Sequence, residues 1–176
     1  MFAACLAISG LKILQPRVFQ DERGSFWESY RRPLYEELGI ALDFPQDNVS
    51  ISRKSTIRGL HYQPGQAKLV SVLSGSIFDV AVDLRKDSPT FGQWASVELS
   101  EANRKQFFIP DGFAHGFCAL SETAIVQYKV SAIYDPKEEK SIRWNDPFFA
   151  IDWPVKEPIL SMRDRLSPFF EPGAVV

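Results

Sequence analysis

Cysteine and histidine are scarce in this sequence, and long hydrophobic runs are missing. The 176 residues include only two Cys and two His. Cys5 and Cys118 do not have the spacing of a metal site, so we expect free thiols in a cytoplasmic protein. No apolar stretch is long enough to cross a bilayer, so no membrane partner is expected. The mildly apolar start of the chain has no basic segment before it, which argues against a secretory signal peptide.

The charge of the chain is close to balanced. The formal net charge is −2, with 20 basic and 22 acidic residues, and this gives no support to a nucleic-acid-binding surface. Hydrophobic residues make up 45% of the chain and charged residues 24%, as in globular proteins. With no internal repeat and no linker, the sequence predicts one domain over residues 1–176.

Short alternating segments dominate the chain and predict β-strands. Aromatic residues favour strands, and the chain has 14 Phe, 5 Tyr and 4 Trp. Turn residues at 21–24 and 75–76 separate extended segments, which indicates an antiparallel sandwich or barrel. In one of these segments Asp79 and Asp83 lie on the face opposite Phe78, Val80, Val82 and Leu84. The extended segments are 11–19, 25–30, 48–52, 68–73, 78–84, 94–99, 105–109 and 124–132.

Helical signals are few. Pro33 can open a short helix that Gly39 would end, because proline suits the first helical turn and glycine the residue after the last. From Trp153 onward the chain contains Pro154, Pro158, Pro168 and Pro172, so we expect an irregular segment or short helices there.

His61 is the main candidate for a catalytic base. It lies in Arg58-Gly59-Leu60-His61-Tyr62-Gln63, and Lys68 follows closely. A lone histidine in a strand often has a purely structural role. Polar and charged groups that face a barrel interior are costly to bury without a ligand, however, and this favours catalysis.

A metal site is not expected, although part of a metal-binding pattern is present. Pro110-x-Gly112-x-x-His115 matches the second half of the motif of cupins, which are small metal-binding jelly rolls. The first half would need His-x-His, but this chain has His61-Tyr62-Gln63. Two imidazoles are too few for a stable divalent site.

Asp164 and Tyr128 could assist His61. Asp164 would matter if the tail folds back so that its carboxylate accepts a hydrogen bond from His61, which would strengthen the base. Tyr128 could donate a proton, because an unperturbed phenol has a pKa of about 10. Otherwise the two residues would be a solvated carboxylate and an ordinary sheet aromatic.

Eight segments in a fixed order carry a specific resemblance. Together they span most of the chain, and the sequence resembles the dTDP-4-dehydrorhamnose 3,5-epimerase family. The segments are Asp21-Glu22-Arg23-Gly24-x-Phe26-x-Glu28, Gln46-Asp47-Asn48, Arg58-Gly59-Leu60-His61-Tyr62-Gln63, Lys68-Leu69-Val70, Asp79-Val80-Ala81-Val82-Asp83-Leu84-Arg85, Ser88-Pro89-Thr90-Phe91-Gly92, Ile109-Pro110-x-Gly112-Phe113-Ala114-His115-Gly116-Phe117 and Trp144-Asn145-Asp146-Pro147.

The resemblance implies a fold, an activity and an assembly. It implies an all-β, cupin-type jelly roll with a few short helices, which forms a homodimer and needs neither metal nor organic cofactor. The implied substrate is dTDP-4-dehydro-6-deoxy-D-glucose and the implied product is dTDP-4-dehydro-L-rhamnose, formed by epimerisation at C3 and C5 through an enolate.

The resemblance also implies a role for individual residues. His61 would be the base with Asp164 as its dyad partner, Tyr128 the proton donor on the opposite face, and Lys68 the cation that stabilises the enolate. Tyr134 would stack on the substrate, and Phe26 is a candidate for the thymine slot. The other positions expected to contact substrate are Arg23, Glu28, Gln46, Asp47, Asn48, Arg58, His115, Glu139 and Arg163.

Three alternatives stay open. The first is a mono-epimerase that acts at C3 or C5 only, on a related dTDP-4-keto-6-deoxy sugar. The second is a jelly roll that binds a sugar nucleotide without catalysis. The third is a metal cupin, which the missing ligands disfavour. The chemistry of a 4-ketone supports an epimerase independently, because enolate formation needs a base, a cation and an acid, and these residues supply all three.

Overall fold

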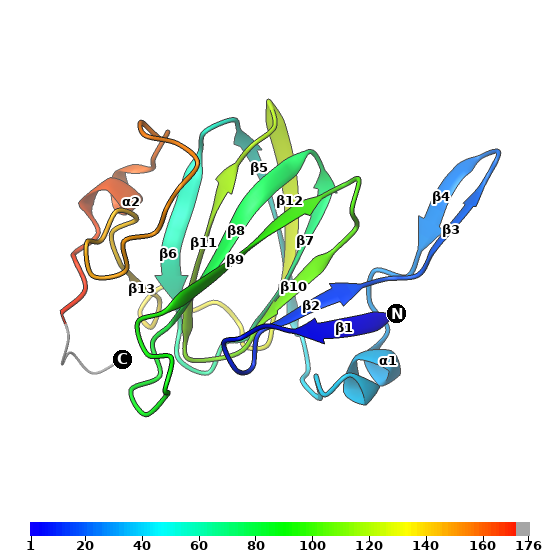
Figure 1. Ribbon diagram of the computed structural model, residues 1–176, viewed down its shortest axis with the longest axis horizontal. Helices are drawn as coiled ribbons and strands as arrows, with labels where there is room; N and C mark the ends of the chain where they lie inside the picture. Colours follow the sequence, from blue (N-terminus) through cyan, green and yellow to red (C-terminus); the bar gives the residue numbers. More distant parts are fainter. Residues whose placement is uncertain (172–176) are drawn as a thin grey trace.

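Two antiparallel sheets face each other in the computed structural model, which describes residues 1–171 (Figure 1). The six-stranded sheet has the order β1 (Phe2–Cys5), β2 (Lys12–Gln15), β10 (Gln106–Ile109), β7 (Lys68–Ser74), β12 (Thr123–Val130) and β5 (Gln46–Arg53). The five-stranded sheet has the order β13 (Lys140–Ser141), β6 (Ile57–Tyr62), β11 (Phe113–Ala119), β8 (Ser76–Asp83) and β9 (Trp94–Ser100). The predicted antiparallel, mostly β architecture is confirmed.

The main core lies between the two sheets, and two further clusters cover their outer faces. Val70, Phe107 and Val126 of the larger sheet pack with Leu99 and Phe117 of the smaller one. Each such buried side chain stabilises the fold by roughly 1.5–3 kcal/mol. The second cluster joins the outer face of the smaller sheet to the C-terminal segment, and the third joins the larger sheet to the helix near the N-terminus.

Strand β8 is buried on both faces. Val80, Val82 and Leu84 pack under the C-terminal segment with Phe149 and Trp153. Asp79 and Asp83, on the opposite face, have no exposed surface either. Alternation alone normally indicates a strand with one solvated face, but here both carboxylates lie in the interior.

The predicted extended segment 11–19 is two strands, not one. Strand β2 ends at Gln15, and β3 (Val18–Asp21) begins a separate hairpin with β4 (Gly24–Trp27). Pro16 lies at the break, where its missing N–H cannot continue a ladder. The predicted turn at 21–24 is confirmed, and β4 ends before the predicted Tyr30. This hairpin projects away from the body of the protein (Figure 1).

Both helices are short, as the sequence predicts. Helix α1 (Arg32–Glu37) has Pro33 in its first turn, and Gly39 follows its end with a φ of +77°. Helix α2 (Met162–Leu166) lies in the otherwise irregular C-terminal segment. Pro172 lies outside the described residues. Within residues 1–171, no helix is both long enough and apolar enough to cross a membrane.

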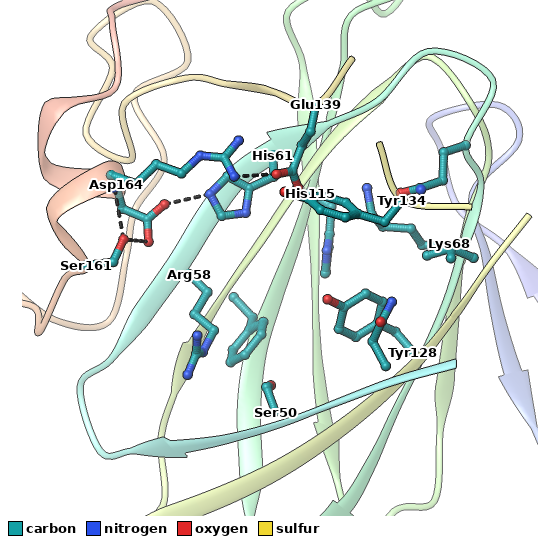
Figure 2. Close-up of a pocket in the computed structure, with 15 residues that line it drawn as sticks. Ser50, Arg58, His61, Lys68, His115, Tyr128, Tyr134, Glu139, Ser161 and Asp164 are labelled. Carbon is teal, nitrogen blue, oxygen red and sulfur yellow. Dashed lines mark hydrogen bonds and ion pairs between the residues drawn. The ribbon is translucent and has the colours of Figure 1, made fainter. Parts of the chain in front are cut away.

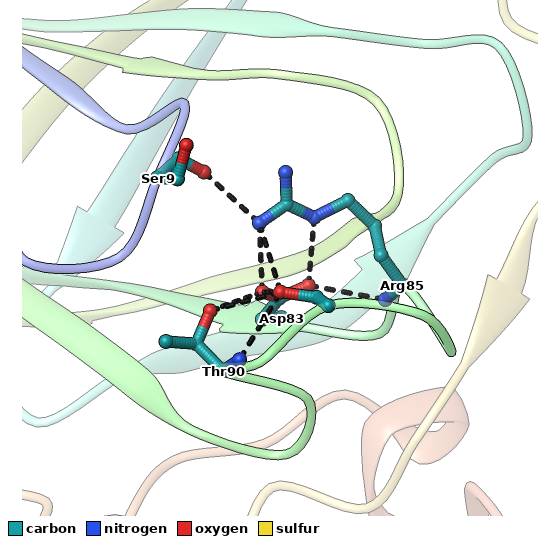
Figure 3. A network of polar contacts seen from close by, with 5 residues as sticks. Ser9, Asp83, Arg85 and Thr90 are labelled. Carbon is teal, nitrogen blue, oxygen red and sulfur yellow. Dashed lines mark hydrogen bonds and ion pairs between the residues drawn. The ribbon is translucent and has the colours of Figure 1, made fainter.

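Strand β8 ends at Asp83. The carboxylate of Asp83 belongs to a polar network that lies apart from the main cavity (Figure 3). The carboxylate accepts two hydrogen bonds from the Arg85 side chain, at 2.8 and 2.7 Å. The hydroxyls of Ser88 and Thr90 donate to it at 2.6 and 2.7 Å, and Arg85 also donates to the Ser9 carbonyl. Burial raises the pKa of Asp83, but these hydrogen bonds outweigh burial and hold the pKa at about 2.

Replacing Asp83 with asparagine should therefore remove an acid-sensitive part of the stability. The folded pKa of Asp83 lies below its ordinary value of 3.8, so its contribution is complete above pH 4 and is lost as pH falls toward about 2. The shift corresponds to about 2 kcal/mol. We expect Asp83→Asn to lower the free energy of unfolding by about that amount at pH 7 and by much less at pH 2. Urea unfolding at both pH values measures this, and an equal loss at both would contradict the assignment.

Candidate active site

A cavity of about 220 Å³ opens between the two sheets (Figure 2). Its walls come from both sheets, from the loop that follows β12, and from α2. The lining residues are Asn48, Ser50, Arg58, His61, Gln66, Lys68, His115, Phe117, Tyr128, Val130, Tyr134, Glu139, Ser161, Arg163 and Asp164.

Two glycines let the strands that carry the histidines approach closely. His61 on β6 pairs with His115 on β11, and the register shifts between His115 and Phe117. Gly59 has a φ of +135°, and a Cβ there would lie 2.5 Å from the Cα of Gly116. Only glycine fits such a contact, so this motif brings both imidazoles to the same end of the cavity.

Asp164 folds back onto His61. The His61 Nε2 atom lies 2.5 Å from Asp164 Oδ1, and the Ser161 hydroxyl donates to Asp164 Oδ2 at 2.8 Å. Burial raises the pKa of Asp164, but its contacts with His61, Ser161 and Arg163 together lower it below the ordinary value. Because an ionised Asp164 accepts a hydrogen bond from Nε2–H, Nδ1 is left as the basic atom of the ring.

Lys68 places a buried amine in the same cavity. Burial lowers its pKa to about 8, although the charges of Glu139, Asp111 and Asp79 favour the ammonium form. At neutral pH the side chain is therefore mostly a cation. It can stabilise a negative charge that develops on a ligand oxygen.

Tyr128 lines the cavity from the sheet opposite His61. Its strand, β12, belongs to the six-stranded sheet, whereas β6 belongs to the five-stranded one. Burial raises the pKa of the phenol, and nearby Glu139 adds to this effect. The hydroxyl therefore stays protonated at neutral pH and can act as an acid. An imidazole and a phenol thus line one cavity from facing sheets (Figure 2).

Most of the site residues expected from the sequence meet in this cavity. His61, Tyr128, Asp164 and Lys68 all line it. Of the positions expected to contact substrate, six more also line it, namely Asn48, Arg58, His115, Tyr134, Glu139 and Arg163. Arg163 forms an ion pair with Glu139 in the lining of the cavity.

Five expected positions lie outside the cavity. Gln46 supports it indirectly, because its amide donates to Asn48 and accepts from the Tyr134 backbone N–H. Asp47 pairs with Lys129, and Glu28 pairs with Arg31. Arg23 and Phe26 lie on the projecting hairpin, where Phe26 is 66% exposed.

Five lining residues were not anticipated from the sequence. A usable signal existed for Ser161, since Ser-x-x-Asp is a pattern that begins helices, and Ser161 accepts from the Asp164 N–H as the N-cap of α2. Ser50 lies two residues after Asn48 on β5, so strand alternation places both on one face. Gln66, Phe117 and Val130 carried no comparable signal.

Within residues 1–171, no group of three or more His, Cys, Asp and Glu side chains is arranged to hold a metal ion. His61 and His115 are adjacent, but each ring nitrogen Nε2 is already engaged by an aspartate.

Comparisons with known proteins agree with one another. A family model described as dTDP-4-dehydrorhamnose 3,5-epimerase matches residues 5–171. The enzyme of that name from Salmonella typhimurium is 51% identical over 170 residues, which cover 94% of this chain and 93% of that protein.

Solved structures extend the similarity to the fold. The epimerase of Bacillus anthracis, with TDP and PPi bound, has a TM-score of 0.94 and 48% identity, covering 96% of this chain and 99% of that one. The Legionella pneumophila enzyme, in complex with dTDP-4-keto-L-rhamnose, has a TM-score of 0.92 and 51% identity, covering 96% and 92%. The chain therefore has the cupin fold of these enzymes.

Proposed function

Because this chain belongs to the dTDP-4-dehydrorhamnose 3,5-epimerase family and is an isomerase, we propose that its cavity inverts C3 and C5 of dTDP-4-dehydro-6-deoxy-D-glucose, yielding dTDP-4-dehydro-L-rhamnose. The observation that carries this proposal is the placement of His61 and Tyr128 on facing sheets around one cavity. Inversion requires removal of a proton from one face of a carbon and its return to the other face. A base and an acid on opposite walls suit that requirement.

The first half of the reaction is proton removal. The C4 ketone acidifies the hydrogens on C3 and C5, and the Nδ1 atom of His61 takes one of them. Asp164 holds the ring and stabilises the imidazolium that forms. The electron pair moves onto the ketone oxygen, where Lys68 offers a positive charge. One preorganised donor at such an oxyanion is worth roughly 3–4 kcal/mol.

The second half is reprotonation from the other face. The Tyr128 hydroxyl gives its proton to the same carbon, which inverts the configuration and regenerates the ketone. Because both C3 and C5 flank the ketone, one base and one acid can serve both carbons after the ring shifts in the cavity, once His61 has released its proton to solvent and the Tyr128 phenolate has regained one. Arg58 and Arg163 in the cavity lining supply guanidinium groups suited to the pyrophosphate.

A homodimer would explain the residues that lie outside the cavity. The β3–β4 hairpin projects from the body, so Arg23 and Phe26 cannot reach their own cavity in this arrangement (Figure 1). Strand β5 is an edge of its sheet, and its Val49 and Ile51 are 60% and 65% exposed. Exposed apolar edges favour association. We therefore place the hairpin of one subunit at the cavity mouth of the other, inside a cytoplasmic enzyme.

Complementation between inactive variants tests this dimer. His61→Ala would remove the base, and the double variant Arg23→Ala, Phe26→Ala would remove the hairpin contacts. A mixed dimer would keep one complete site, formed by the intact cavity of the hairpin variant and the intact hairpin of the His61 variant. Mixing equal amounts after partial unfolding and refolding should restore about a quarter of wild-type activity, because half of the dimers are mixed. No recovery, with dimers present on a sizing column, would contradict the exchange.

Proton exchange with solvent tests the activity and separates the alternatives. The protein is incubated with dTDP-4-dehydro-6-deoxy-D-glucose in D₂O, and a downstream reductase traps the product. Deuterium at both C3 and C5 would support the double epimerase. Deuterium at only one of these carbons would contradict it and support the mono-epimerase. Binding without exchange would favour the non-catalytic jelly roll, and activity lost with a chelator and restored by metal would favour the metal cupin.

A further inference from the structure

The loop between β12 and β13, residues 131–139, has no regular secondary structure, yet it places Tyr134 and Glu139 in the cavity lining (Figure 2). Backbone groups in such a loop usually bond to water, and the loop is then mobile. Side chains that bond the same groups hold a loop in one arrangement. The partners of this backbone therefore decide how firmly the two lining residues are placed.

Gln63 bridges the backbone on both sides of Tyr134. Its Nε2 atom donates to the carbonyl of Ile133 at 3.0 Å, and its Oε1 atom accepts from the N–H of Asp135 at 2.9 Å. A primary amide suits this bridge because it carries a donor and an acceptor side by side. Gln63 is buried and does not itself line the cavity. It therefore holds Tyr134 from behind.

Two further glutamines bond neighbouring backbone groups of the loop. Gln46 Oε1 accepts from the N–H of Tyr134 at 2.8 Å, and Gln66 Nε2 donates to the carbonyl of Ala132 at 3.0 Å. We call Gln46, Gln63 and Gln66 the amide clamp. Its members come from the start of β5 and from the segment between β6 and β7, so the loop is fastened to both sheets.

The clamp also affects Glu139, because that residue is placed by Asp135. The Asp135 carbonyl accepts from the N–H groups of Glu138 and Glu139 at 3.1 and 3.0 Å. Glu139 in turn forms its ion pair with Arg163. The position of Asp135 therefore affects Arg163 as well as Tyr134.

We propose that Gln63 is a positioning residue of the epimerase, which fixes the Tyr134 loop before substrate arrives and so raises the affinity for the dTDP half of the sugar nucleotide. This inference rests on the proposed function. The hexose must reach Lys68, which is 8% exposed, whereas Tyr134 is 43% exposed, so the nucleotide half lies on the Tyr134 side. A loop that is already ordered favours affinity, because the cost of ordering it does not fall on the binding step.

Gln63→Met tests this role. Methionine is also long and unbranched, so it fills the buried space but removes both hydrogen bonds. Fixing the backbone of one residue costs about one tenfold step in an equilibrium constant, so KM for dTDP-4-dehydro-6-deoxy-D-glucose and the Kd for dTDP should each rise about 10-fold. The value of kcat, and deuterium exchange at saturating substrate, should stay near wild type, because His61, Lys68 and Tyr128 are unchanged.

Ser121→Ala is the control for loss of a side chain that bridges two backbone groups. The Ser121 hydroxyl accepts from the N–H of Ser76 at 2.9 Å and donates to the carbonyl of Thr123 at 2.7 Å, and Ser121 does not line the cavity. KM, kcat and the Kd for dTDP should all stay at their wild-type values in this variant. An unchanged KM in Gln63→Met, a fall in its kcat alone, or equal changes in both variants would overturn the proposal.

Amide hydrogen exchange in the wild-type protein replaces this test if Gln63→Met does not fold. The N–H groups of Tyr134 and Asp135 should exchange slowly in the free protein, because Gln46 and Gln63 accept from them. Fast exchange at both, with protection only after dTDP is added, would contradict a loop that is fixed beforehand.

Failure of the proposed function would look different. A wild-type protein that binds dTDP but neither exchanges substrate protons nor epimerises would refute the epimerase activity. The Kd for dTDP in Gln63→Met would still test the clamp, because that measurement needs no turnover.

Discussion

His61→Ala should abolish solvent exchange at both C3 and C5 of the sugar nucleotide. In the proposed mechanism the same imidazole serves both carbons, and His61 Nε2 lies 2.5 Å from Asp164 Oδ1 in the wall of the cavity. A general base contributes about 10²–10⁴-fold, so exchange should fall by at least that range. The measurement is deuterium incorporation in D₂O, followed by NMR at each carbon separately.

Asp164→Asn is the matched control for this variant. It keeps the imidazole in the cavity but removes the charge that stabilises the imidazolium, so exchange should fall at both carbons by a smaller factor. Both variants should still bind dTDP, because both keep Arg58 and Arg163. Exchange that survives in His61→Ala at either carbon would show that another group is the base there.

Tyr128→Phe should reduce net epimerisation far more than it reduces exchange. The phenyl ring keeps the packing of Tyr128 against the main core. Without the hydroxyl an enolate can still form at His61 and recapture a proton on its original face, which gives exchange without inversion. Comparing the two rates on one sample, by NMR of the substrate and trapping of the product, measures the difference.

Tyr62→Phe is the appropriate control for loss of a phenol hydroxyl. Tyr62 follows His61 on β6, but its ring packs in the cluster under the C-terminal segment and does not line the cavity. Both rates should stay at their wild-type values in this variant. Equal loss of exchange and epimerisation in Tyr128→Phe would contradict its role as the acid and would place it in substrate binding.

Much of the fold follows from local rules in the sequence. Alternation and turn residues predict β5, β7, β8, β9, β10 and β12, and Pro33 with Gly39 predicts α1, but the predicted segments do not include β1, β6, β11 or β13. The sequence does not predict the break between β2 and β3 at Pro16. A proline in an edge strand and a proline between two strands give the same local sequence pattern. The burial of both faces of β8 was also not predictable, since it depends on where the C-terminal segment lies.

The site depends on contacts that no local pattern contains. His61 and Asp164 are 103 positions apart, and their pairing was expected only from the family resemblance. The same resemblance placed Arg23 and Phe26 with the substrate, but a single chain keeps them on a projecting hairpin. No local pattern contains the contact with a second subunit that the proposed dimer would give these residues.

A crystal structure with the intact sugar nucleotide bound tests the central claim most directly. The account predicts that the His61 imidazole and the Tyr128 hydroxyl lie on opposite faces of the hexose ring, each about 3–3.5 Å from a carbon beside the ketone. The Lys68 amine should lie nearest the ketone oxygen. A hexose bound with both side chains on the same face, or bound outside this cavity, would contradict it.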